Sequence, residues 1–385
     1  MAKRKSPKDT ENRKSPKNSE NTKSAFFKRI EREFQEGLTG KFEADERFVS
    51  RKIEQYEGNL FFDEIAEIGL NLLRERYSDI VPEPPDYIQD DETPKLHKKL
   101  EQIAGDLEKG NFGAVLTRAG KIVKQIEKLG KYRETDECRY FSFTELFEQI
   151  LSGHLYPTRK KLVFFDAPYP AVYLVYAQAL FSFGRRGEAL AAAQKGLYWN
   201  PVDFDLTALI AEIEKDSGEM ESFFARSKEM FKIAFQPEYV AFCYNNLSEY
   251  FQSRNLEIES MACAMLAKPF TDGLEEDPFM LSLFETENGK SGKSRKKFKT
   301  LPKKRIQEII RKTGIPPGAD SVIVALATEM GRKALVAANP ELAAYAFRIA
   351  FLLTQDETIA AILDNLDPYL EEPEPEPADP EDLPF

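Results

Sequence analysis

Residues 170–201 contain two amphipathic helical patterns separated by a glycine-containing turn, and no other feature constrains the fold as strongly. Apolar residues recur at helical spacing over 173–180 and again over 189–197. Between the two stripes, Gly184 and Gly187 supply the positive φ that a tight reversal of the chain requires. The segment therefore predicts two antiparallel helices, and its small residues allow these helices to approach closely.

This hairpin resembles one tetratricopeptide repeat, a helix–turn–helix unit of about 34 residues. The aromatic, small and proline positions of that family fall on Tyr173, Tyr176, Ala177, Leu180, Gly184, Ala189, Gly196 and Pro201. The chain departs from the family pattern at Leu180, Ala193 and Gly196, where tyrosine, an aromatic residue and alanine are usual. Repeats of this family stack into solenoids that bind other proteins, so the resemblance implies an interaction module. An ordinary helical hairpin within a bundle is the alternative.

Two further units follow in the same register, although their patterns are weaker. The first occupies 204–237 with Gly218 at its turn, and it is two residues longer between turn and proline than the unit before it. The second occupies 244–269, with Asn255 at its turn. Because a single hairpin cannot bury both of its faces, these neighbours support a stacked arrangement.

Helical patterns also flank the repeat-like region on both sides. They cover 100–107 and 115–126 with a break at Gly110, a short stretch at 144–155, and, downstream, 306–310, 322–334 and 342–353. Asn339 is expected to cap the last of these helices, and 354–357 fits a capping box. No strand is expected, because β-branched residues never alternate over a run. We therefore predict an all-α fold, a right-handed alpha-solenoid of tetratricopeptide-like hairpins with extra N- and C-terminal helices.

Charge is distributed unevenly along the chain, and this distribution sets the expected boundaries. Residues 1–24 carry a net charge of +5, residues 288–304 carry eight bases and no acid, and residues 367–385 carry eight acids and no base. Segments of this composition cannot offset the entropy cost of ordering, so we expect them to be disordered. The predicted organisation is a basic tail (1–24), an N-terminal helical region (25–92), a repeat-like domain (93–270), a flexible basic linker (271–300), C-terminal helical hairpins (301–366) and an acidic, proline-rich tail (367–385).

The basic segments suggest a second class of partner, because lysine and arginine clusters bind the phosphates of nucleic acids. Against this, the whole chain has a net charge of −11 and the basic runs contain a single aromatic residue, Phe298. They therefore lack the stacking platform that single-strand binders use, and no nucleic-acid-binding motif is evident. Pairing of the basic linker with the acidic tail inside the molecule is an equally acceptable explanation of both segments.

The three cysteines, Cys138, Cys243 and Cys263, form no close pair in the sequence. An odd number of separated cysteines argues against a disulfide framework and suits a reducing compartment. The N-terminus is charged and has no apolar signal segment, and the longest apolar stretch, near 172–183, is too short to span a bilayer. We therefore expect a cytoplasmic protein that does not enter a membrane.

Catalytic chemistry has little support in the sequence. The two histidines, His97 and His154, have no partner at a metal-ligand spacing. Residues 289–294 resemble the end of a phosphate-binding loop, but that loop needs glycine at position 287, which is glutamate. We predict no catalytic residue, no metal site and no cofactor, while an enzyme with an unrecognised site stays a lesser alternative.

The tetratricopeptide resemblance implies a location for the binding surface. In that family the first helix of each unit lines the concave face. The corresponding residues here are Leu174, Gln178 and Phe181 in the first unit, Ala208, Glu212 and Lys215 in the second, and Asn245, Glu249 and Gln252 in the third. Some members hold a C-terminal carboxylate with lysine and asparagine at these positions, and the residues at 174, 178, 208 and 212 depart from that set. A groove of amides, acids and one apolar patch suits an extended or helical peptide of basic character. The alternative for Phe181 is a place in the core.

Overall fold

The computed structural model describes residues 16–56, 59, 61–77, 85–271 and 301–367, which form two compact units divided at Pro84. Most of the described chain is helical, which confirms the predicted fold class at that level. Nearly all of the predicted basic linker and acidic tail lies outside the described residues. Within the described residues, no helix combines the length and the apolar character needed to cross a membrane.

The N-terminal unit consists of three helices, α1 (Pro16–Gly37), α2 (Phe42–Glu54) and α3 (Phe62–Arg76). Ile30, Phe34, Val49 and Ile65 form its core and are essentially inaccessible to solvent. Because α1 begins at Pro16, the helix extends into the range 1–24 that the sequence had indicated as a tail.

A buried carboxylate joins the ends of the helices in this unit. Asp45 accepts hydrogen bonds from the backbone N–H groups of Thr39 and Gly40, at 2.6 and 2.9 Å, and from the Tyr77 hydroxyl at 2.5 Å. Burial raises the pKa of Asp45, but these hydrogen bonds outweigh it and hold the pKa well below its usual range. The loop before α2 is thereby tied to the end of α3.

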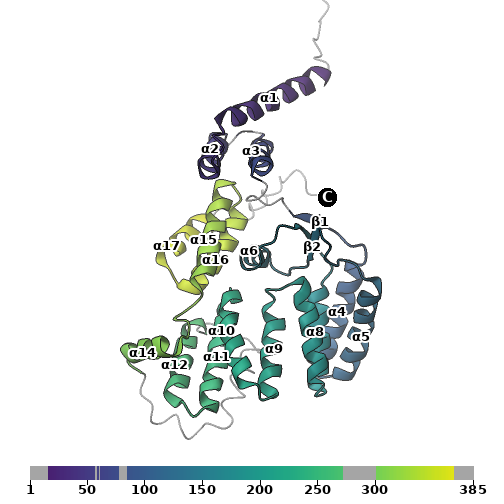
Figure 1. The fold of residues 1–385 in the computed structure, drawn as a ribbon, viewed down its shortest axis with the longest axis vertical. Helices are drawn as coiled ribbons and strands as arrows, with labels where there is room; N and C mark the ends of the chain where they lie inside the picture. The colour runs from purple at the N-terminus through teal and green to yellow at the C-terminus, as the bar shows by residue number, and fades with distance from the viewer. Residues whose placement is uncertain (1–15, 57–58, 60, 78–84, 272–300, 368–385) are drawn as a thin grey trace, which may run out of the picture. The chain divides into compact units, whose positions relative to one another are not determined.

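Four helical hairpins follow one another in the second unit (Figure 1). Their helices are α4 (Thr93–Glu108) with α5 (Phe112–Leu129), α7 (Tyr169–Ser182) with α8 (Arg186–Trp199), α9 (Phe204–Asp216) with α10 (Met220–Glu229), and α11 (Pro237–Ser253) with α12 (Glu257–Ala267). The second helix of each hairpin packs against the first helix of the next hairpin. Helix α9 lies between two core clusters, since Leu206 belongs to one and Phe204 to the other.

The turns of these hairpins match the sequence prediction with one exception. Gly184 and Gly218 have φ values of 69° and 78°, and Asn255 has a φ of 58°. Gly187 does not contribute to the reversal, because it lies inside α8. The two extra residues of the second repeat-like unit fall where α10 continues into a short 3₁₀ helix, η1 (Met230–Ile233), before Pro237.

Small residues allow close helix contacts in the α7–α8 hairpin. Ala189 is completely buried. A Cβ atom at Gly196 would lie 2.6 Å from Leu206 Cδ1 and 3.1 Å from Tyr173 Cβ, so even alanine does not fit there without a shift. The departure from the tetratricopeptide pattern at this position therefore has a packing cause, because α9 approaches α8 too closely for a side chain.

The prediction that the chain contains no strand is wrong. Three short strands, β1 (Asp86–Ile88), β2 (Cys138–Phe141) and β3 (Lys161–Phe165), form a parallel sheet in the order β1-β3-β2. Helix α6 (Leu146–Leu155) connects β2 to β3. With three to five residues each, the strands are too short to show alternation, and the apolar run at 162–165 has no distinctive period.

The last four described helices are α14 (Lys303–Thr313), α15 (Ser321–Val336), α16 (Pro340–Thr354) and α17 (Glu357–Leu366). Asn339 caps α16 as predicted, because its side chain accepts a hydrogen bond from Leu342 N at 2.9 Å. The capping box predicted from Thr354 is wrong. Gln355 adopts a left-handed φ of 55° and closes α16, so Asp356 becomes the cap of α17 and accepts from Thr358 N at 2.7 Å.

Candidate functional site

The first helices of two consecutive hairpins, α9 and α11, lie side by side and present the candidate site. At one end, the Phe204 and Tyr239 rings stack with their centroids 3.9 Å apart. About three helical turns away, Lys215 Nζ contacts Glu249 Oε2 at 2.7 Å. We call the surface between these contacts the acidic face, defined by Asp205, Glu212 and Glu249 with the single base Lys215.

The structure brings together three of the residues that the sequence placed on the concave face, Glu212, Lys215 and Glu249. Burial raises the pKa of Glu212, the Lys215 charge partly offsets this, and the Glu249 charge adds to it. The Lys215 ammonium lies 5.6 Å from the centroid of the Phe223 ring. One cation is therefore shared between two carboxylates, and an acidic excess remains. Asn245 is half-buried and Gln252 is exposed on the same helix as Glu249.

The predicted residues on α7 behave differently. Leu174 and Phe181 are partly buried and pack against the core cluster formed by α4, α5, α7, α8 and α9. This agrees with the alternative that Phe181 belongs to the core. Gln178 is half-buried, and in the described chain no ion pair or side-chain hydrogen bond joins these three residues to the acidic face. Ala208 on α9 likewise packs against core residues.

Sequence reasoning missed Asp205 and Tyr239. Burial raises the pKa of Asp205 although its side chain is exposed to solvent. The Asp205 carboxylate therefore has many protein atoms around it but is still reached by water. Burial also raises the pKa of Tyr239, and the nearby Asp205 charge raises it further. Asp205 lies three residues before Ala208 on the same side of the helix. It would have been included if the predicted set of Ala208, Glu212 and Lys215 had been extended by one turn toward the N-terminus.

Carboxyl groups continue from the acidic face toward α6. Asp203 caps α9 by accepting a hydrogen bond from Leu206 N at 2.9 Å, and burial raises the pKa of Asp203 to about 7. Glu148 of α6 accepts from Asn200 Nδ2 at 3.0 Å and from Thr144 N at 2.8 Å, and burial raises its pKa as well. The Glu148 charge also contributes to the raised pKa of Asp203. The N-terminal end of α9 is therefore a second concentration of acids.

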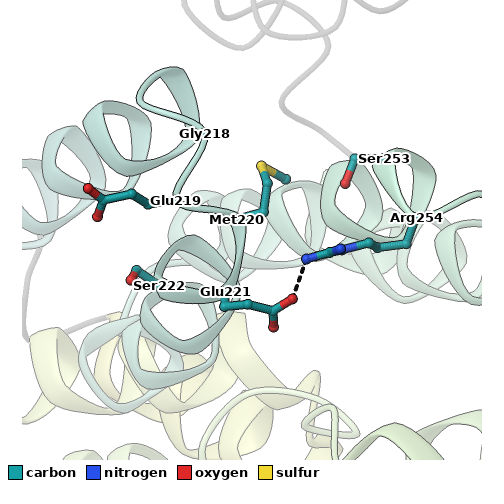
Figure 2. Close-up of a pocket in the computed structure, with 7 residues that line it drawn as sticks. All are labelled: Gly218, Glu219, Met220, Glu221, Ser222, Ser253 and Arg254. Atoms are coloured by element: carbon teal, nitrogen blue, oxygen red, sulfur yellow. Dashed lines mark hydrogen bonds and ion pairs between the residues drawn. The ribbon is translucent and has the colours of Figure 1, made fainter.

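A separate open hollow lies at the turns of the hairpins α9–α10 and α11–α12 (Figure 2). Its main charged groups, Glu221 and Arg254, form an ion pair with each other, and Tyr250 donates a hydrogen bond to Glu221 at 3.1 Å. Figure 2 shows the side chains of Glu219 and Ser222 directed away from this pair. The hollow thus contains one satisfied charge pair and one further carboxylate, Glu219, whereas the acidic face has two more carboxylates than bases.

Among the described residues, few side chains are suited to act as a nucleophile or to bind a metal ion. His97 and His154 are both exposed. Cys243 and Cys263 are buried, and burial raises the pKa of the Cys263 thiol to about 12 and that of Cys243 well above its ordinary value. A buried thiol of this kind is not a reactive nucleophile. In the described ranges no three His, Cys, Asp or Glu side chains gather as a metal site would require.

No protein-family model matches the chain, and no curated protein matches it. The tetratricopeptide resemblance therefore remains a prediction from the residues of 170–201 and their neighbours. What the chain does has to be inferred from the chemistry of its surfaces.

Proposed function

We propose that the chain is a non-catalytic scaffold or adaptor that binds a basic peptide segment along the acidic face. The observation that carries this proposal is the excess of carboxylates on two adjacent helices, Asp205 and Glu212 on α9 and Glu249 on α11, with Lys215 as the one base among them. The groups are surrounded by protein but reach solvent, so a partner can approach them.

The arrangement of the hairpins supports a tetratricopeptide-like solenoid as the frame of this surface. Each second helix packs against the first helix of the next hairpin, and this contact recurs from α5–α7 to α8–α9 and α10–α11. Repetition of one contact favours a common orientation of the first helices α7, α9 and α11. In such a frame α9 and α11 form the acidic part of the concave face, and α7 forms a more apolar part.

The chemistry of the acidic face suits lysine and arginine side chains. Carboxylates whose pKa is raised by burial interact strongly with a cation that displaces water, because the local dielectric constant is low. Half-buried Tyr239 and Phe242 supply aromatic surface beside Phe204 for the aliphatic part of such side chains. The Asn245 and Gln252 amides can hydrogen-bond to a peptide backbone. Phosphates of nucleic acid would be repelled here.

The proposal is tested by measuring the affinity of a short lysine-rich peptide. The double variant Asp205→Asn with Glu212→Gln removes two charges while keeping side-chain size. We expect it to weaken binding about tenfold or more, since truncating a close charge pair costs about 1.5 kcal/mol upward. Glu219→Gln, an exposed carboxylate outside the acidic face, is the matched control. Equal affinity for the wild type and the double variant would refute the proposal.

A further inference from the structure

Helix α14 carries a basic surface that the proposed function does not use. Its apolar residues Ile306, Ile309 and Ile310 share one side, and Ile309 is 3% exposed. The opposite side is exposed and includes Lys304, Arg305, Arg311 and Lys312. At 3.6 residues per turn, Lys304 and Arg311 lie almost directly in line. We call this surface the basic face of α14.

The charges of the basic face have few partners. Within the described residues, Arg305 forms an ion pair with Glu308 at 2.9 Å, and Lys303, Lys304, Arg311 and Lys312 form none. The helix holds five bases and one acid. Its apolar residues face the protein, so the basic face has no hydrophobic group to insert into a membrane. It is suited to a polyanion that stays in solvent.

The sequence after α17 has the complementary charge. Residues 368–385 contain seven acids and no base, and six prolines interrupt them. We propose that this acidic segment lies along the basic face of α14 in the same molecule. Proline-rich segments favour an extended chain, which can follow a helix and place successive carboxylates beside its bases.

The distances allow this contact. Helix α14 ends close to the start of α15, because Gly314 lies beside Lys228 and the Asp320 charge acts on Lys232, which follows Lys228 by one helical turn. Leu366, the last residue of α17, packs with Ala334 near the other end of α15. Ala334 follows the first residue of α15, Ser321, by 13 positions, so these points are about 20 Å apart at the α-helical rise. An extended segment of 18 residues spans about 55 Å, which is more than enough to reach α14 and run along it.

The physical consequence is competition for the basic face. A tethered segment has an effective concentration on the order of 1 mM, which lets even a weak contact form in a large share of molecules. Exposed charges interact through solvent, so the contact weakens as salt rises. While it forms, other polyanions are hindered from binding α14.

Carbodiimide cross-linking of the full chain tests the contact directly, because it joins only carboxylates and amines that already touch. We expect cross-links from carboxylates of residues 371–382 to Lys303, Lys304 or Lys312, and their loss at high salt. A mixture of isotopically light and heavy protein separates links within one molecule from links between molecules. Links that run mainly to lysines outside α14, or mainly between molecules, would overturn the proposal.

A second measurement uses heparin as a polyanion probe. Removal of residues 368–385 should strengthen heparin binding about tenfold, since a competitor of millimolar effective concentration is lost. In the double variant Lys304→Glu with Arg311→Glu, the truncation should no longer increase the affinity for heparin. In the matched double variant Lys98→Glu with Lys124→Glu, which changes exposed lysines on α4 and α5, the truncation should still increase it. Unchanged heparin affinity after truncation, or an equal gain in the α14 variant, would contradict the contact.

Discussion

The acidic face of α9 and α11 and the basic face of α14 are both rich in one charge, but they are supported differently. The acidic face rests on two packed hairpins, and burial raises the pKa of Asp205 and Glu212. The basic face belongs to one helix that fully buries a single residue, Ile309, and its charges stand in solvent. Charges surrounded by protein interact strongly with a partner of defined shape, whereas exposed charges attract polyanions in a diffuse, salt-sensitive way. The surroundings of a charge therefore decide what kind of partner it selects.

The largest expected effect concerns the frame beneath the acidic face. Ala189→Arg should destabilise the protein by about 3 kcal/mol or more, because a long charged side chain would be forced into a closed helix contact. Ala191→Arg, at an exposed position of the same helix α8, should change stability little. Thermal unfolding of both variants measures the difference. Equal melting temperatures would show that the hairpin stack is not the rigid frame assumed in the comparison.

Charge reversal on the acidic face should have the next largest effect. Glu249→Lys removes the partner of Lys215 and places two like charges together, so affinity for a lysine-rich peptide should fall by about 2 kcal/mol, or roughly 30-fold. Lys304→Glu on α14 should leave that affinity unchanged. Calorimetric titration of both variants gives the two values. A similar change in both would mean that net charge controls binding and that the two faces are not distinct.

The raised pKa of Asp203 predicts a pH dependence of stability. The folded state holds the Asp203 proton to about pH 7, whereas an unfolded aspartate loses it near pH 4. The folded state therefore binds more protons between these values, and stability falls as pH rises through this window. Asparagine is an equally good helix cap but cannot ionise. We expect Asp203→Asn to remove part of the decline, about 1–2 kcal/mol, in urea unfolding at pH 5 and pH 7.5. If the free energy of unfolding changed equally with pH in the wild type and in Asp203→Asn, the pKa of Asp203 would not be raised by folding.

The smallest expected effect is on the basic face. Removal of residues 368–385 should change the free energy of unfolding by less than about 1 kcal/mol, because exposed ion pairs contribute little to stability. The same truncation is expected to alter heparin binding strongly. A large loss of stability would show that the segment packs into the fold rather than resting on a solvated surface.

The hairpins could be predicted from sequence because their determinants are local. Gly184 and Asn255 mark their turns through the positive φ that few other residues accept, and the apolar stripes on either side have a helical period. The helix starting at Pro340 was predictable for the same reason, since Asn339 caps it directly.

The sheet could not be predicted because its determinants are not local. Tyr87 pairs with Phe164 across more than seventy residues, and each strand is too short to carry a period. The candidate site was predicted in part. Glu212, Lys215 and Glu249 were assigned to one surface and lie near one another, whereas the place of Asp205 beside them depends on its surroundings in the packed structure.

Site-specific photo-cross-linking tests the central claim that the acidic face binds a basic peptide. A benzophenone side chain would be introduced at Gln252, which is exposed on α11 one turn from Glu249, and separately at Ser222, which is exposed on α10. The lysine-rich peptide should be captured from position 252 and not from position 222, and a glutamate-rich peptide of the same length should be captured from neither. Equal capture of the lysine-rich peptide at both positions, or none at position 252, would contradict the account.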